Sequence, residues 1–103
     1  MDQKPREAFL SSLDRALDTF GTSVRAVVYY ELKKSFGVLR EEIPLKPDLF
    51  ANTIDNLFGV GVATVRHVIL RELEASSQIK DLHKKDLVTA MREAYHKLLE
   101  EMT

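Results

Sequence analysis

The sequence predicts an all-α protein, a compact bundle of four to five helices. Three observations predict it. Apolar residues recur at steps of three and four along most of the chain, Gly and Pro fall between these periodic segments, and no segment alternates apolar and polar residues convincingly enough to be a strand. The segments expected to be helical are residues 5–20, 23–36, 47–58, 62–75 and 81–102.

Length and composition set the class of protein. The chain has 103 residues, which suits one domain, and we expect residues 1–103 to form it. It has no cysteine, so disulfides and thiolate metal ligands are excluded. A net charge of -1 predicts no strong overall attraction to nucleic acid. With a polar N-terminus and no apolar run of roughly 20 residues, we expect a cytoplasmic domain with neither signal peptide nor membrane span.

The first helix is expected over residues 5–20. Pro5 suits its first turn and Gly21 its C-terminal cap. Charged residues lie largely between the apolar ones, so one face should be buried. That face consists of Phe9, Leu10, Leu13, Leu17 and Phe20.

The second helix, residues 23–36, should start with Ser23 as N-cap and end at Gly37. Its valines and tyrosines also suit a strand, but helical apolar spacing persists to the end of the segment, and both ends carry helix punctuation. The expected buried stripe consists of Val24, Val27, Val28, Leu32 and Phe36.

Two adjacent tyrosines, Tyr29 and Tyr30, lie in this helix. Neighbouring side chains on a helix point about 100° apart, so only one of them can enter the core. The other is a candidate anchor of a protein interface. The alternative is a tyrosine that shields the bundle with its hydroxyl in water.

The middle of the chain loses its periodicity over residues 38–47, where two prolines favour an ordered connector anchored by Ile43 and Leu45. Pro47 then starts the third helix, which Gly59 ends. Its inward residues are expected to be Phe50, Ile54, Leu57 and Phe58.

The last two helices follow the Gly59–Gly61 corner. The fourth should fray at residues 75–77, and the start of the fifth stays open because Asp81 or Asp86 can cap it, with Ile79 and Leu82 as an extra turn. The inward residues are expected to be Val62, Val65, Val68, Ile69 and Leu73 on the fourth helix, and Leu87, Met91, Tyr95, Leu98 and Met102 on the fifth.

The Gly-Val-Gly corner resembles the helix-hairpin-helix motif over residues 57–69, with a match at Leu57, Gly59, Val60, Gly61, Val65, Val68 and Ile69. The resemblance implies that backbone amides at the start of the fourth helix meet a nucleic-acid phosphate. The contacts would come from Gly59, Gly61, Thr64 and Arg66. The alternative is a tight turn between two packed helices.

A longer resemblance covers about residues 13–75. It is carried by Phe36-Gly37-Val38, Arg40-Glu41-Glu42-Ile43-Pro44, Pro47 with Phe50, Leu57-Phe58-Gly59-Val60-Gly61 and Ile69-Leu70-Arg71-Glu72-Leu73. These residues look like a family of small archaeal helical domains that occurs alone or as an output domain of signalling proteins. The family implies an α-helical fold and a signalling or interaction role, and it supplies no catalytic residues.

Chemistry-bearing motifs are missing from the sequence. It has no Gly-x-Ser-x-Gly elbow, Walker loop or dinucleotide fingerprint. Glu93 and His96 have the spacing of bundle metal sites, but no second Glu-x-x-His accompanies them, so a solvated pair is favoured. We therefore expect no enzyme, no cofactor and no metal, but a helical module that binds a protein partner or itself. Nonspecific nucleic-acid binding through the Gly59–Gly61 corner is the alternative.

Overall fold

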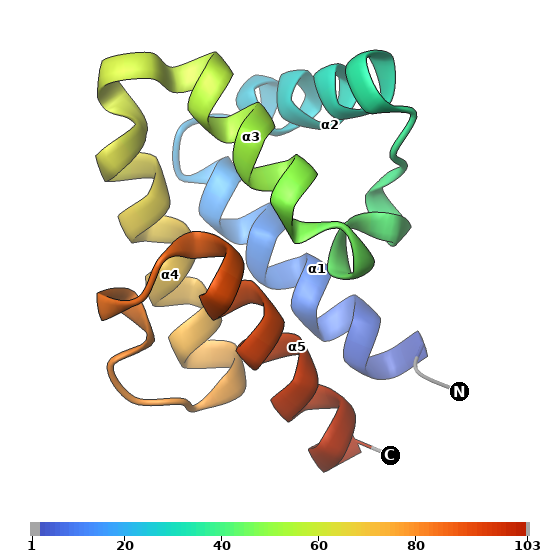
Figure 1. Ribbon diagram of the computed structural model, residues 1–103, viewed down its shortest axis with the longest axis vertical. Helices are drawn as coiled ribbons and strands as arrows, with labels where there is room; N and C mark the ends of the chain where they lie inside the picture. Colours follow the sequence, from blue (N-terminus) through green and yellow to red (C-terminus); the bar gives the residue numbers. More distant parts are fainter. Residues whose placement is uncertain (1–2, 103) are drawn as a thin grey trace.

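The computed structural model describes residues 3–102, and it confirms the all-α bundle. Figure 1 shows the helices packed against one another and joined by loops and turns. The described elements are α1 (Gln3–Asp18), α2 (Thr22–Phe36), the 3-10 turn η1 (Arg40–Leu45), α3 (Pro47–Phe58), the 3-10 turn η2 (Gly59–Gly61), α4 (Val62–Ser77), the 3-10 turn η3 (Leu82–Lys84) and α5 (Leu87–Met102).

Helix α1 is the centre of the bundle. It packs most extensively on α4 and α5, while α2 lies across its C-terminal part and packs on α3 as well. The buried side chains of all five helices form one core, as the apolar stripes predict. From α1, the core receives Phe9, Leu10, Leu13, Ala16 and Leu17.

The corner between α1 and α2 differs from the prediction. Helix α1 ends at Asp18 rather than residue 20. The backbone N–H groups of Phe20 and Gly21 donate 3-10-type hydrogen bonds to the carbonyls three residues earlier, those of Leu17 and Asp18, at 3.0 and 2.9 Å. Gly21, with φ 115°, occupies the N-cap of α2. Ser23 was therefore wrong as the N-cap, since the reversal needs a backbone conformation that only glycine adopts readily.

The connector before α3 forms η1. Glu42 accepts a 2.8 Å hydrogen bond from the Leu39 backbone N–H and so closes the turn. Ile43 is fully buried, as predicted, whereas Leu45 is 71% exposed. The prediction of Leu45 as an anchor was wrong, because the 3-10 turn points residues 43 and 45 in different directions.

Helix α4 continues to Ser77, beyond the predicted fraying at residues 75–77. The buried hydroxyl of Ser77 donates a 2.7 Å hydrogen bond to the Leu73 carbonyl, and Lys97 of α5 donates to the Ser77 carbonyl at 3.1 Å. Gln78 then ends the helix in the left-handed conformation. The helix does not fray because a cation from α5 binds the carbonyl of its last residue.

Helix α5 begins at Leu87, not at residue 81. Asp86 accepts hydrogen bonds from the backbone N–H and the hydroxyl of Thr89, at 3.1 and 2.7 Å, and is the cap. Asp81 has φ 61°, which no residue of a continuous right-handed helix adopts. Leu82 lies buried in the separate turn η3.

The predicted stripes are wider than the core. Of the α2 stripe, Val28 and Leu32 are fully buried and Val24 is half-buried, but Val27 and Phe36 are exposed. Leu57 of α3 and Met102 of α5 are also more exposed than predicted. Five short helices close their core before all apolar residues are used, so several apolar side chains of α2 and α3 remain exposed.

Candidate functional site

Two exposed apolar residues, Val27 of α2 and Leu57 of α3, line a hollow between α2 and the end of α3. The hollow has a volume of about 210 Å³. We call this hollow, together with four exposed apolar residues of α2, α3 and η2 near it in the sequence, the neutral face. Its hollow is lined by Ser23, Val24, Val27, Val28, Leu57 and Phe58, and its exposed apolar residues are Val27, Tyr30, Leu57 and Val60.

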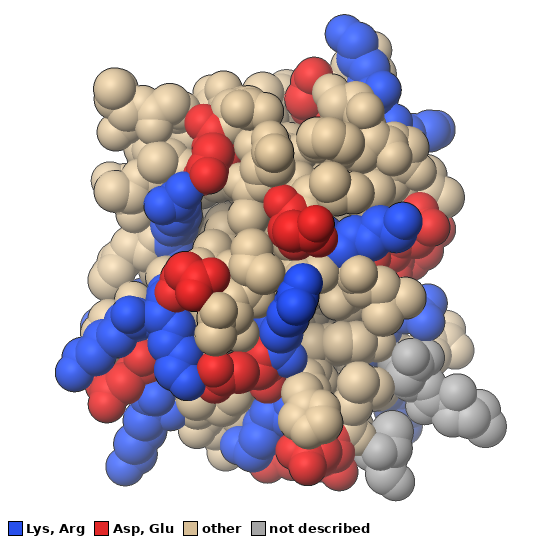
Figure 2. Space-filling model, viewed as in Figure 1, with Lys and Arg blue, Asp and Glu red and all other residues tan. Residues whose placement is uncertain are grey.

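Two chain segments that contribute to this face contain no charged residue. Residues 56–65, which form the corner between α3 and α4, contain no Asp, Glu, Lys or Arg, and neither do residues 26–30 of α2. Figure 2 shows an uncharged area at the upper left, over the α3–α4 corner, with acidic and basic side chains beside it and more of them in the lower half of that view. Depletion of charge and exposure of aliphatic and aromatic groups are typical of the core of a protein interface.

The two tyrosines divide as the helical geometry predicts. The hydroxyl of Tyr29 donates a 2.6 Å hydrogen bond to Asp14, and its ring is half-buried. Burial and this hydrogen bond raise the pKa of Tyr29, so its hydroxyl remains a donor. Tyr30 is 64% exposed. Of the two candidate interface residues, Tyr30 therefore has a side chain that is accessible to a partner, whereas the side chain of Tyr29 connects α2 to α1.

The candidate phosphate contacts lie at the corner, but much of their hydrogen-bonding capacity is already used. The amide of Gly59 donates to the Asp55 carbonyl, and the amide of Val62 donates to the Gly59 carbonyl. The guanidinium of Arg66 turns to the Asp55 carboxylate. Gly61 and Thr64 are exposed. Gly59, with φ 51°, ends α3 as a turn residue, which agrees with the alternative of a tight turn between two packed helices.

Glu93 and His96 of α5, which have the spacing of a metal site, each pair with a different residue. Glu93 binds Lys85 at 2.6 Å, and His96 lies 3.7 Å from Glu100. Among residues 3–102, no group of three or more His, Asp or Glu side chains is arranged to hold a metal ion. No helix in the same range is both long and apolar enough to span a membrane.

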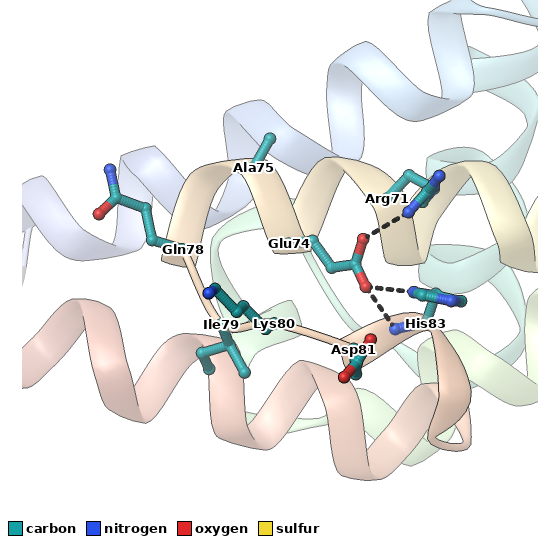
Figure 3. Close-up of a pocket in the computed structure, with 8 residues that line it drawn as sticks. All are labelled: Arg71, Glu74, Ala75, Gln78, Ile79, Lys80, Asp81 and His83. Carbon is teal, nitrogen blue, oxygen red and sulfur yellow. Dashed lines mark hydrogen bonds and ion pairs between the residues drawn. The ribbon is translucent and has the colours of Figure 1, made fainter.

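A polar cluster between α4 and η3 was missed in the sequence. Glu74 accepts hydrogen bonds from the His83 backbone N–H at 2.8 Å and from Arg71 at 3.1 Å, and it lies 2.5 Å from Nδ1 of His83 (Figure 3). Burial acts to raise the pKa of Glu74, but the bonds from His83 and Arg71 outweigh it and lower that pKa to about 2. The ring of His83 also contacts the ring of His67, with centroids 6.2 Å apart.

Sequence spacing alone could not reveal this cluster, because nine residues and a loop separate Glu74 from His83. The one available signal is that His67 and Glu74 lie seven residues apart on α4, which places them on one helical face. The cluster borders a wide hollow of about 500 Å³ that includes Lys80 and Asp81.

Comparison with protein-family models, curated proteins and solved structures returned no match. The resemblance to archaeal output domains and to the helix-hairpin-helix motif therefore stays a prediction.

Proposed function

We propose that this chain is a non-enzymatic interaction module that uses the neutral face to bind protein, and that the occupant of this face is a second copy of the chain. The observation that carries the proposal is an apolar hollow lined by the exposed Val27 and Leu57, formed by chain segments in which residues 26–30 and 56–65 carry no charge. A role as a signalling output or adaptor domain belongs to the same proposal and rests on the family resemblance.

The size of the hollow favours a side chain as its occupant. Small-molecule sites usually enclose about 300–1,000 Å³, whereas this hollow has about 210 Å³. Its walls are almost entirely apolar and offer little to orient a polar ligand. An aliphatic group suits such a space, because its burial is favourable and needs no hydrogen bond.

A second copy fits the face for two reasons. Val60 is fully exposed in η2, two residues after the hollow-lining Phe58, so one copy carries both an apolar projection and an apolar hollow. In a two-fold dimer the same patch meets itself, so each projection can fill the partner's hollow. A face with so little charge brings little like-charge repulsion when two copies meet.

Sedimentation velocity from micromolar to millimolar concentration tests this association. We expect a concentration-dependent dimer for the unmodified chain and a monomer for Val60→Asp. A control variant, Met102→Asp, adds the same charge at an exposed apolar residue of α5 and should still dimerise. A chain that is monomeric throughout would contradict self-association and leave a different protein as the candidate occupant.

Nonspecific nucleic-acid binding at the corner has less support. Phosphate binding needs cations or free amides, but residues 56–65 carry no cation and Arg66 is paired with Asp55. Titration into labelled duplex DNA at low and moderate salt tests it. Affinity that falls with salt and is lost in Arg66→Ala would favour the rival proposal.

A further inference from the structure

Two histidines from different elements meet beside Glu74. His67 lies on α4 and His83 in η3, and their ring centroids are 6.2 Å apart with an interplanar angle of 79°. The left-handed residues Gln78 and Asp81 turn the chain back along α4, which brings His83 against the face that carries His67 and Glu74. The fold therefore places two imidazoles together without any sequence motif.

Glu74 fixes the orientation of one of these rings. Its Oε2 atom binds both the backbone N–H of His83, at 2.8 Å, and the Nδ1 side of the ring, at 2.5 Å. Figure 3 shows the other ring nitrogen pointing away from this carboxylate. A histidine that binds a metal through one ring nitrogen usually donates the N–H of its other nitrogen to a carboxylate or another acceptor. The contact with Glu74 would supply that second interaction and leave Nε2 of His83 for a metal.

We propose that Nε2 of His83 and the imidazole of His67 together bind one divalent transition-metal ion, with water completing its coordination. Metal–nitrogen distances of about 2.0–2.1 Å place two such ring centroids roughly 5–6 Å apart. The observed 6.2 Å is slightly longer, and the exposed side chain of His67 can rotate to close the difference.

The surroundings restrict which ions bind. Imidazole nitrogen suits Cu²⁺, Ni²⁺ and Zn²⁺, whereas Mg²⁺ and Ca²⁺ require several oxygen ligands. Arg71 binds Glu74 at 3.1 Å and Lys84 lies 3.8 Å from Asp81, so each nearby carboxylate already has a cationic partner. The site should therefore take imidazole-binding ions and reject hard cations.

Titration calorimetry with Ni²⁺ on the full chain without an affinity tag tests the site. We expect one ion per chain, a loss of affinity of more than tenfold in His67→Ala and in His83→Ala, and a loss of about tenfold in Glu74→Gln, which removes the orienting charge. The matched control is His96→Ala, because His96 is an exposed histidine of α5 and should leave the affinity unchanged. Mg²⁺ should give no binding heat.

Electron paramagnetic resonance with Cu²⁺ supplies a second readout, in which we expect hyperfine coupling to two nitrogens that falls to one in His67→Ala. The exposed side chain of His67 makes this variant decisive even if His83→Ala is poorly folded. Unchanged Ni²⁺ affinity in His67→Ala, an equal loss in His96→Ala, or no binding at all would overturn the proposal.

Discussion

The hydroxyl of Tyr29 on α2 donates a 2.6 Å hydrogen bond to the carboxylate of Asp14 on α1. Arg40 of η1 binds the same carboxylate at 2.7 Å, so one acidic side chain joins three elements. The hydrogen bond to Asp14 raises the pKa of Arg40, in agreement with a stable charged pair. This network fixes the inner side of α2, and Val27 and Tyr30 are left on its outer side.

Replacement of Tyr29 by Phe should lower the free energy of unfolding by about 1–2 kcal/mol, because it removes a donor to a charged, partly buried acceptor. Urea denaturation measures the change. Tyr30→Phe is the matched control and should change stability by less than about 0.5 kcal/mol, since Tyr30 lies in solvent. Equal losses in the two variants would show that the network does not hold α2.

Of the two residues predicted to anchor the connector η1, only Ile43 should contribute to the stability of the protein. Ile43→Ala should cost about 2–4 kcal/mol, because Ile43 is fully buried. Leu45→Ala should cost less than about 0.5 kcal/mol, because most of the Leu45 side chain is already in water. Thermal or chemical denaturation of both variants decides, and a larger loss for Leu45→Ala would contradict the arrangement of η1.

Capping by Asp86 should make the stability of α5 depend on pH. Hydrogen bonds from the hydroxyl and then the backbone N–H of Thr89 lower the pKa of Asp86 below its ordinary value of 3.8. Because the folded pKa is lowered, the stabilisation is complete above the ordinary pKa and is lost as pH falls through the folded pKa. Asp86→Ala should lower the melting temperature by a few degrees at neutral pH.

Asp86→Asn is the control for this prediction, because asparagine caps a helix without charge. Its melting temperature should stay near that of the unmodified chain at neutral pH, and the remaining difference should shrink as pH falls toward 3. Thermal denaturation followed by circular dichroism over this pH range checks both variants. A difference that grows on acidification would contradict the proposed role of Asp86.

Helix type and most core positions could be predicted, because apolar spacing and Gly or Pro punctuation act locally. Asp86 and Asp81 have equal capping propensity, and the structure decides between them through the left-handed conformation of Asp81 and the hydrogen bonds from Thr89 to Asp86. Whether Ser77 frays or remains helical depends on Lys97, twenty residues away. Such boundaries are set by tertiary contacts, which a local pattern does not contain.

The functional surfaces were harder to predict than the helices. Val27 belongs to the same apolar stripe as Val28, and its exposure depends on where α3 lies across α2. The contact between His67 and His83 depends on the loop that reverses the chain after α4. For Tyr29 and Tyr30, by contrast, helical geometry already required that only one be buried, and only the choice between them needed the structure.

The most direct test of the neutral face is photo-crosslinking in native cells, with a benzophenone amino acid incorporated at position 60 or, as a control, at position 100. Glu100 is exposed on α5, at the C-terminal end of the chain. We predict a discrete crosslinked product from position 60, at the mass of two copies, and none from position 100. No product at position 60, or the same products from both positions, would contradict an interaction role for this face.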